Sequence, residues 1–305
     1  MNFGIPYQGS KNAIVPWVVS LLPPAETFVD LFAGGCAVTH GAMISGKYQN
    51  FICNDIGDAP KLFQDAIEGK YKNERRWISR EKFFAEKDND PYIRIIWSFG
   101  NNQRDYMYAK EVEPWKKALH WARVYGDCSL LREMGIPYNG SQESIRKHER
   151  ECREKYAEWY RDCFNATIGA EIAIKQLESL QSLQSLQRLQ SLQSLQRLQS
   201  LQSLQRLQRS YDEVEIPKNA CVYCDPPYRG TVGYLGEFDF GKFDEWLRNA
   251  PFPVYISEYS MPSDFVEVGR CAKRGLACAT QNNLVCEKVF VHEKWANKIE
   301  RTTLF

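Results

Sequence analysis

Asp225, Pro226, Pro227 and Tyr228 form the tetrapeptide whose residue types could most directly do chemistry. They follow an apolar run, Ala220–Cys224, which predicts a buried strand. Such a strand brings a carboxylate, a rigid backbone corner and an aromatic face to the carboxyl edge of a sheet, where open α/β sheets bind ligands. Two prolines after a strand are also common in ordinary turns. Taken alone, the tetrapeptide therefore favours a ligand site and a structural turn about equally.

The same tetrapeptide resembles motif IV of the amino-group DNA methyltransferases, which methylate adenine at its exocyclic nitrogen. That nitrogen is a poor nucleophile because its lone pair is delocalised into the ring. Asp225 and the Pro226 carbonyl could accept its hydrogens and favour a tetrahedral, reactive nitrogen. Proline fixes φ and keeps the corner rigid, and Tyr228 could stack on a base turned out of the helix. In the family, Asp at the first position indicates nucleic-acid amines, whereas Asn occurs also with RNA or glutamine substrates.

A glycine-bearing turn near the amino terminus is a candidate cofactor site. An apolar strand that includes Asp30 and Phe32 runs into Gly34 and Cys36 and then into a plausible helix. Glycine at such a turn lets a ligand approach the backbone closely. The segment resembles motif I of the same family, Phe-x-Gly-x-Gly, with Cys36 in place of the second glycine. The resemblance implies that Asp30, Phe32 and Gly34 bind the cofactor; an ordinary strand-to-helix turn is the alternative.

Asp55 follows a second apolar run, residues 50–54, which predicts a short strand. An acidic residue about twenty residues beyond a glycine turn is placed to accept hydrogen bonds from both ribose hydroxyls of a nucleoside. This arrangement suits S-adenosyl-L-methionine. An Asp after a strand is also a common helix cap, but the upstream turn favours the ribose role. No Gly-Lys-Ser or Gly-Lys-Thr follows the glycines, so a nucleoside triphosphate is not expected.

The extreme amino terminus carries a weaker pattern, aromatic-x-Gly-x-Lys, at Tyr7, Gly9 and Lys11. It resembles motif X of the family, which lies against the cofactor. The resemblance implies that Tyr7 contacts the cofactor and that Lys11 lies near its methionine carboxylate or near Asp225. Without the resemblance, the segment is a polar loop that contains a lysine.

The order of these motifs resembles that of the alpha-type, Dam-like DNA adenine-N6 methyltransferases over residues 1–65 and 211–265. The resemblance implies an α/β, Rossmann-like fold that depends on S-adenosyl-L-methionine. It also implies direct methyl transfer to adenine N6 of double-stranded DNA, without a metal or a cysteine nucleophile, and it places Asp225 against the cofactor as well as the base. Residues 253–259 and 288–292 predict further strands of the sheet.

These motifs divide the chain into three parts. Residues 1–70 and 211–305 are expected to form the catalytic domain, residues 71–176 a mostly helical target-recognition insert, and residues 177–210 a low-complexity repeat. Basic and aromatic residues are interleaved through the insert, which suits DNA contact. Mixed charges on helices, however, more often simply face water.

Within the insert, Asn101, Asn102, Gln103 and Arg104 form the expected DNA contact loop. Gly-Asn-Asn is prone to turns, and amide and guanidinium side chains read base edges. These four residues are therefore assigned to DNA binding.

Leu-Gln-Ser and Leu-Gln-Arg triplets repeat from Leu177 to Gln208. Good helix formers without Gly or Pro favour a helical spacer. A period of three does not match 3.6, so the leucines would wind around an α-helix and form no continuous buried seam. A 3₁₀ helix would align the leucines but is usually short; a stacked coil with the leucines inside is a third alternative.

Composition sets broad limits on function. A net charge of +1 over 305 residues does not by itself indicate a nucleic-acid binder, although global balance can hide a local basic stripe. No run approaches the ~20 apolar residues of a membrane span, and no basic-then-apolar leader precedes Tyr7. Ten cysteines without framework spacing are typical of a reducing compartment, so we expect a cytoplasmic protein.

Two other functions stay open. One is a methyltransferase that acts on RNA or on a protein amide, against which Asp at position 225 and the aromatic-basic insert argue. The other is a catalytically weak DNA-binding or scaffold protein, which Cys36 would suit but which the presence of both Asp55 and Asp225 disfavours. No motif indicates the recognised DNA site or the oligomeric state.

Overall fold

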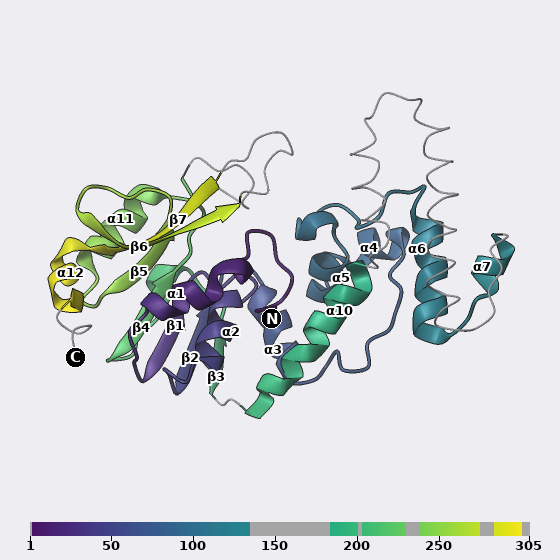
Figure 1. Cartoon of the computed structure of the whole chain (residues 1–305), viewed down its shortest axis with the longest axis horizontal. Coiled ribbons are helices and arrows are strands. Elements are labelled where there is room, and N and C mark those ends of the chain that lie inside the picture. Colours follow the sequence, from purple (N-terminus) through teal and green to yellow (C-terminus); the bar gives the residue numbers. More distant parts are fainter. Residues whose placement is uncertain (1, 135–183, 201–202, 230–237, 275–283, 301–305) are drawn as a thin grey trace, which may run out of the picture. The chain divides into compact units, whose positions relative to one another are not determined.

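The computed structural model describes residues 2–134, 184–200, 203–229, 238–274 and 284–300 (Figure 1). The chain divides into two compact units. The sheet unit consists of Met1–Lys70 and Leu192–Phe305, and the helical unit is Tyr71–Ser191.

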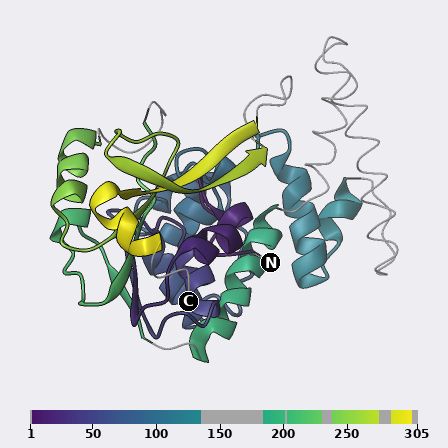
Figure 2. The same cartoon turned by 60° about the vertical axis from the view of Figure 1, so that its left-hand side comes forward.

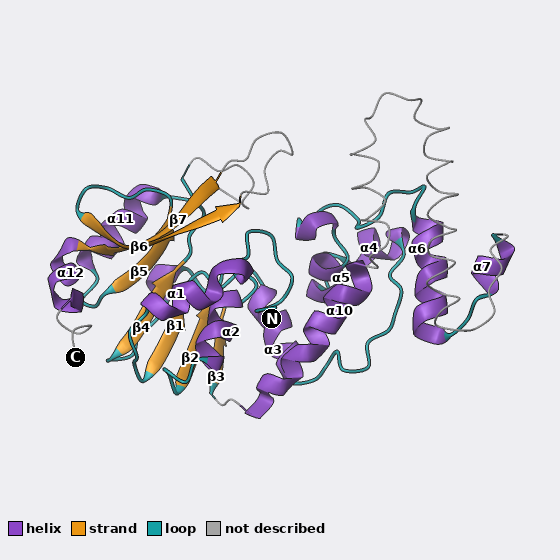
Figure 3. Ribbon diagram, in the orientation of Figure 1, coloured by secondary structure: helices purple, strands orange, loops and turns teal. Residues whose placement is uncertain are grey.

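The sheet unit is built on one seven-stranded sheet with the order β3-β2-β1-β4-β5-β7-β6 (Figure 3). All neighbouring strands are parallel except β7, which runs antiparallel to both β5 and β6. β6 and β7 lie side by side in both cartoon views (Figure 2). The strands are β1 Thr27–Asp30, β2 Asn50–Asn54, β3 Leu204–Leu207, β4 Ala220–Cys224, β5 Val254–Glu258, β6 Phe265–Arg274 and β7 Leu284–His292.

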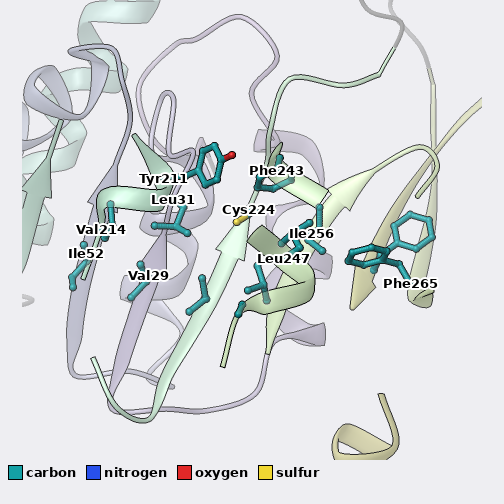
Figure 4. Packing of buried hydrophobic residues seen from close by; sticks show 14 residues of the cluster. Val29, Leu31, Ile52, Tyr211, Val214, Cys224, Phe243, Leu247, Ile256 and Phe265 are labelled. Carbon is teal, nitrogen blue, oxygen red and sulfur yellow. The ribbon is translucent and has the colours of Figure 1, made fainter. Parts of the chain in front are cut away.

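Helices pack on both faces of this sheet. The apolar cluster on one face joins Phe243 and Leu247 of α11 to Val29, Cys224 and Ile256 of the strands (Figure 4). α1, α2 and α3 pack against one another or against β1, β2, β3 and β6. The helices of the sheet unit are α1 Val15–Leu21, α2 Ala37–Ile44, α3 Ala59–Ile67, α11 Phe240–Asn249 and α12 Glu293–Glu300, with 3₁₀ turns at Asn12–Ile14 and Tyr211–Glu213.

The expected α/β, Rossmann-like fold is confirmed. The apolar runs at residues 50–54 and 220–224 are β2 and β4, and residues 253–259 contain β5. Residues 288–292 are the second half of β7. Short apolar runs therefore predicted the parallel strands β2, β4 and β5, because a strand buried on both faces needs apolar residues at every position.

The triplet repeat forms three elements where one helical spacer was expected. α10 covers Gln184–Ser194, a 3₁₀ helix covers Leu195–Ser200, and β3 pairs in parallel with β2. The expectation that the leucines wind around the helix applies to an α-helix. From Leu195 the chain has three residues per turn, which aligns the leucines as the 3₁₀ alternative predicts. The buried leucines are Leu189, Leu192, Leu195 and Leu198. Residues 177–183 lie outside the described residues.

The described part of the helical unit consists of helices and loops with one isolated bridge between Ser98 and Tyr106. An aromatic cluster fills its interior: the Trp77 and Tyr108 rings stack with centroids 5.6 Å apart. The helices are α4 Arg80–Glu86, α5 Pro91–Ile96, α6 Glu113–His120 and α7 Ser129–Glu133, with a π-helix at Trp121–Tyr125. Over the residues that the structure describes, neither unit has a helix long and apolar enough to cross a membrane.

Candidate active site

The carboxyl edge of the sheet gathers the acidic residues that the sequence singled out. β1 ends at Asp30, Asp55 follows β2, and Asp225 follows β4. The strand order reverses between β1 and β4, which are neighbours in the sheet. Open α/β sheets bind ligands at such a reversal, so Asp225 lies where a ligand is expected.

A buried ion pair joins the amino-terminal segment to this edge. Lys11 Nζ lies 2.8 Å from Asp225 Oδ1, and the Lys11 side chain is only 6% exposed. Burial raises the pKa of Asp225, and the nearby Lys11 ammonium opposes this rise. The predicted proximity of Lys11 to Asp225 is therefore present in the structure.

Tyr228 is held from three sides. Its hydroxyl donates a hydrogen bond to Glu287 Oε2 at 2.7 Å, and Lys11 Nζ lies 4.5 Å from its ring centroid. The Tyr259 ring meets it at 84° with centroids 4.5 Å apart. Tyr228 is 6% exposed whereas Tyr259 is 37% exposed, so Tyr259 offers the larger open aromatic surface.

Glu258, the last residue of β5, fixes the backbone after the tetrapeptide. Its two carboxylate oxygens accept the N–H groups of Arg229, at 3.1 Å, and of Tyr259, at 2.7 Å. The Arg229 guanidinium pairs with Asp244 of α11 at 2.5 Å. The corner that begins at Pro226 is thus tied to β5 and to α11.

Asp55 is hydrogen-bonded to the glycine turn. Its Oδ2 accepts the Gly34 N–H and its Oδ1 accepts the Gly57 N–H, both at 2.8 Å. Burial raises the pKa of Asp55, and these two hydrogen bonds oppose the rise. The next residue, Ile56, is a large apolar side chain that is 70% exposed.

The amino-terminal segment is packed directly on the same turn. The Ile5 N–H donates to Gly35 O at 2.8 Å, and the Gly4 N–H donates to His40 Nδ1 at 2.9 Å. Burial lowers the pKa of His40 to about 4, so His40 is neutral and can accept this bond. A Cβ on Gly35 would lie 2.5 Å from Cβ of Tyr7. Only a residue without a side chain fits at position 35.

Asp30 is the last residue of β1, and Phe32 lies between β1 and the glycine turn. Asp30 is 1% exposed, accepts the Thr39 hydroxyl at 2.8 Å, and has a pKa raised by burial to about 7. The Phe32 ring stacks on Tyr211 with centroids 5.4 Å apart. Cys36, where the motif expects glycine, adopts a left-handed φ of 57° and is buried. These residues therefore make structural contacts next to the glycine turn.

The expected DNA loop belongs to the helical unit and uses most of its polar side chains to hold itself. Asn101 Nδ2 donates to Ile95 O at 2.9 Å, and Asn102 accepts the N–H groups of Arg104, at 2.9 Å, and Asp105, at 3.0 Å. Gln103 Oε1 accepts Arg94 Nε at 3.3 Å.

One side chain of this loop and one that precedes it are exposed to solvent. Arg104 is exposed, and Phe99 is 64% exposed. Arg188 donates to the carbonyls of Ile96 and Ser98 at 2.7 and 2.8 Å, so the base of the loop is fixed.

Sequence reasoning missed Glu258, Glu287 and Tyr259. Glu258 ends an apolar strand, which is the same signal that singled out Asp55, and could have been found in that way. Glu287 lies inside a strand between Cys286 and Lys288. Nothing in that local pattern distinguishes a buried carboxylate from an exposed one.

The strand order and the acidic residues at its reversal point define a Rossmann-like, S-adenosylmethionine-dependent methyltransferase fold. The family model for the D12 class N6 adenine-specific DNA methyltransferases matches residues 7–304, and the chain belongs to this family. The chain has no match among curated proteins. Membership establishes DNA adenine methylation as the activity and implies S-adenosylmethionine as the methyl donor.

Replacing Gly35 by Ala is expected to cost roughly 1–3 kcal/mol of stability by overpacking the turn and, because the turn is displaced, to weaken cofactor binding about tenfold. The new methyl group would push Tyr7 and Ile5 off the turn. Isothermal titration with S-adenosylhomocysteine measures the effect. Gly46→Ala is the control: Gly46 has a φ of 72° but open space around it, so it should lose stability and keep its affinity. Wild-type affinity of Gly35→Ala would show that the amino-terminal segment does not shape the cofactor site.

Proposed function

We propose that the chain is an alpha-type, Dam-like enzyme that methylates adenine N6 in double-stranded DNA. The order of motifs supports the subtype, and the family match supports the reaction. The observation that carries the mechanism is the buried Lys11–Asp225 pair at the end of β4. A cytoplasmic location is part of the proposal, and the free thiols of the seven described cysteines are consistent with it.

Asp55, Gly34 and Ile56 are proposed to hold the adenosine half of S-adenosyl-L-methionine. A carboxylate oxygen can accept two hydrogen bonds, so each Asp55 oxygen that takes one backbone N–H can also take a ribose hydroxyl. Gly34 has no side chain between the turn and the Tyr7 ring, which a Cβ would approach to 3.0 Å, and the exposed Ile56 suits one face of an adenine ring. When bound, the cofactor supplies an electrophilic methyl group on a sulfonium sulfur.

Asp225 and the Pro226 carbonyl are proposed to accept the two hydrogens of adenine N6. Both bonds favour a tetrahedral nitrogen whose lone pair would form the new N–C bond while the methyl–sulfur bond breaks and its electron pair stays on the leaving sulfur. The nitrogen then carries a positive charge and one proton must leave. Because burial raises its pKa, Asp225 is a better base than an ordinary Asp and can take that proton.

The target base is proposed to stack on Tyr228 and to meet the exposed Tyr259 ring beside it. The two rings are already fixed edge to face, and Glu258 holds the backbone that carries both. A preorganised aromatic corner lowers the cost of placing an unstacked base.

DNA contact is proposed for the loop of Asn101, Asn102, Gln103 and Arg104. The internal hydrogen bonds of the first three residues hold the loop in shape. The exposed Arg104 is then the residue of this loop best placed to reach phosphate or a base edge.

Arg104→Ala is expected to weaken DNA binding. If Arg104 contacts a phosphate, the slope of the logarithm of the affinity against the logarithm of the salt concentration should also become smaller by about one. Fluorescence anisotropy over a salt series measures both quantities. Arg132→Ala, a change of another exposed arginine of the helical unit, controls for the loss of one charge. Equal affinities for the Arg104→Ala and Arg132→Ala variants would remove the loop from the contact surface.

Methylation of RNA or of a protein amide, and a scaffold without transfer, are the alternatives that the sequence alone leaves open. The D12 family match favours DNA over both other substrates. The Lys11–Asp225 pair disfavours the scaffold, since removing the Lys11 ammonium from water is costly and adds little stability, which suits a catalytic role better than a structural one.

Asp225→Asn is expected to lower methyl transfer at least about 100-fold, because the isosteric amide cannot accept the departing proton. Transfer of label from S-adenosyl-L-methionine to unmethylated DNA, followed by nucleoside digestion, measures the rate and the product. Asp212→Asn removes a carboxylate that pairs with exposed Lys242 and should leave the rate unchanged.

The kcat/KM of the wild type should rise with pH, with a midpoint above the usual Asp pKa of about 4. Burial raises the pKa of Asp225, and this carboxyl group must lose its proton before it can act as a base.

Wild-type turnover by the Asp225→Asn variant would contradict the mechanism. Label that appears in RNA or protein but not in DNA would support the other substrates. Cofactor binding without any transfer would support the scaffold.

A further inference from the structure

Glu287 is a buried carboxylate that the topology brings to the candidate active site. It is 4% exposed and lies near the start of β7. Because β7 is antiparallel to β5, its start meets the carboxyl ends of the parallel strands. The register agrees: Lys288, the next residue, pairs with Glu258 at the end of β5.

Glu287 contacts two residues assigned to the reaction. Its Oε2 accepts the Tyr228 hydroxyl at 2.7 Å and lies 3.9 Å from Lys11 Nζ. The same Nζ is 2.8 Å from Asp225 Oδ1. One buried ammonium thus stands between two carboxylates, and one of these also fixes the tyrosine.

We propose that Glu287 is a positioning residue for methyl transfer. It orients the Tyr228 ring through the hydroxyl and shares Lys11 with Asp225, so that Asp225 stays a strong acceptor for adenine N6. Without the Glu287 carboxylate, the Lys11 ammonium would interact more strongly with Asp225, and a carboxylate held more strongly by an ammonium accepts a proton less readily. This inference rests on the proposed role of Asp225.

The charges around Asp225 determine what removal of Glu287 would change. Asp225 interacts with Lys11 from the amino-terminal segment, Glu287 from β7, Asp30 from β1 and Glu258 from β5. Burial is the main cause of the raised pKa of Asp225; Lys11 lowers the pKa and Glu287 raises it. Neutralising Glu287 therefore lowers the pKa of Asp225. Asp30, with a pKa of about 7, titrates in wild type and variant alike, so the difference between their profiles is informative.

The test is Glu287→Gln, which keeps an acceptor for the Tyr228 hydroxyl and removes the charge. We expect kcat to fall about tenfold, with KM for DNA and for S-adenosyl-L-methionine nearly unchanged. The acid limb of the kcat profile should move to lower pH. Glu267→Gln is the matched control on the neighbouring strand β6: Glu267 pairs with Arg270 and Lys288, and its loss should change neither kcat nor the limb.

The proposal would be overturned if Glu287→Gln had the wild-type kcat and the same acid limb in its pH profile as the wild type. A fall in kcat with an unmoved limb would also overturn it, since a purely structural role predicts that result. If Glu287→Gln fails to fold, judged by its melting curve, Tyr228→Phe provides the test. Removal of that one hydroxyl should lower kcat several-fold at constant KM, and wild-type kcat would overturn the inference. Absence of transfer by the wild type would refute the proposed function itself.

Discussion

The buried ammonium of Lys11 is the interaction on which the rest of the site depends. Burying a charge costs free energy that nearby opposite charges must offset. The carboxylates of Asp225 and Glu287 are the opposite charges next to Lys11. Lys11 comes from the amino-terminal segment rather than from the sheet. That segment must therefore be fixed, and it is: Ile5 bonds to the glycine turn, and Gly35 leaves room for the chain to pass. The ion pair links the turn that is proposed to hold the cofactor with the corner that is proposed to hold the base.

Sheet topology explains why these residues converge. β1 and β4 are neighbours although a long stretch of chain separates them, and their following loops carry the glycine turn and Asp225. The antiparallel β7 adds a residue from its beginning, Glu287, where the parallel strands contribute residues from their ends. The carboxylate of Glu258 then ties two backbone N–H groups of this edge together. Each contact is local, but the combination requires the whole sheet.

Much of this arrangement could be predicted from the sequence, because short apolar runs that end in a carboxylate mark buried parallel strands. Asp55 and Asp225 were found in this way. Glu287 was not, since its burial depends on a strand pairing distant in sequence. β3 was missed because the triplet pattern around Leu204 has no strand period, and its pairing with β2 overrides the helix propensity of the repeat. The burial of Asp30 depends on packing against α2 through Thr39, which motif spacing does not encode.

The most direct test of the coupling between the two halves of the site is single-turnover methyl transfer by a Lys11→Gln variant. It should be measured with saturating S-adenosyl-L-methionine and DNA, with N6-methyladenine identified after nucleoside digestion. The expected result is N6-methyladenine as the wild-type product and a transfer rate at least about 100-fold lower in the variant. A wild-type rate in Lys11→Gln would contradict it, because the buried ammonium would then be dispensable for positioning Asp225.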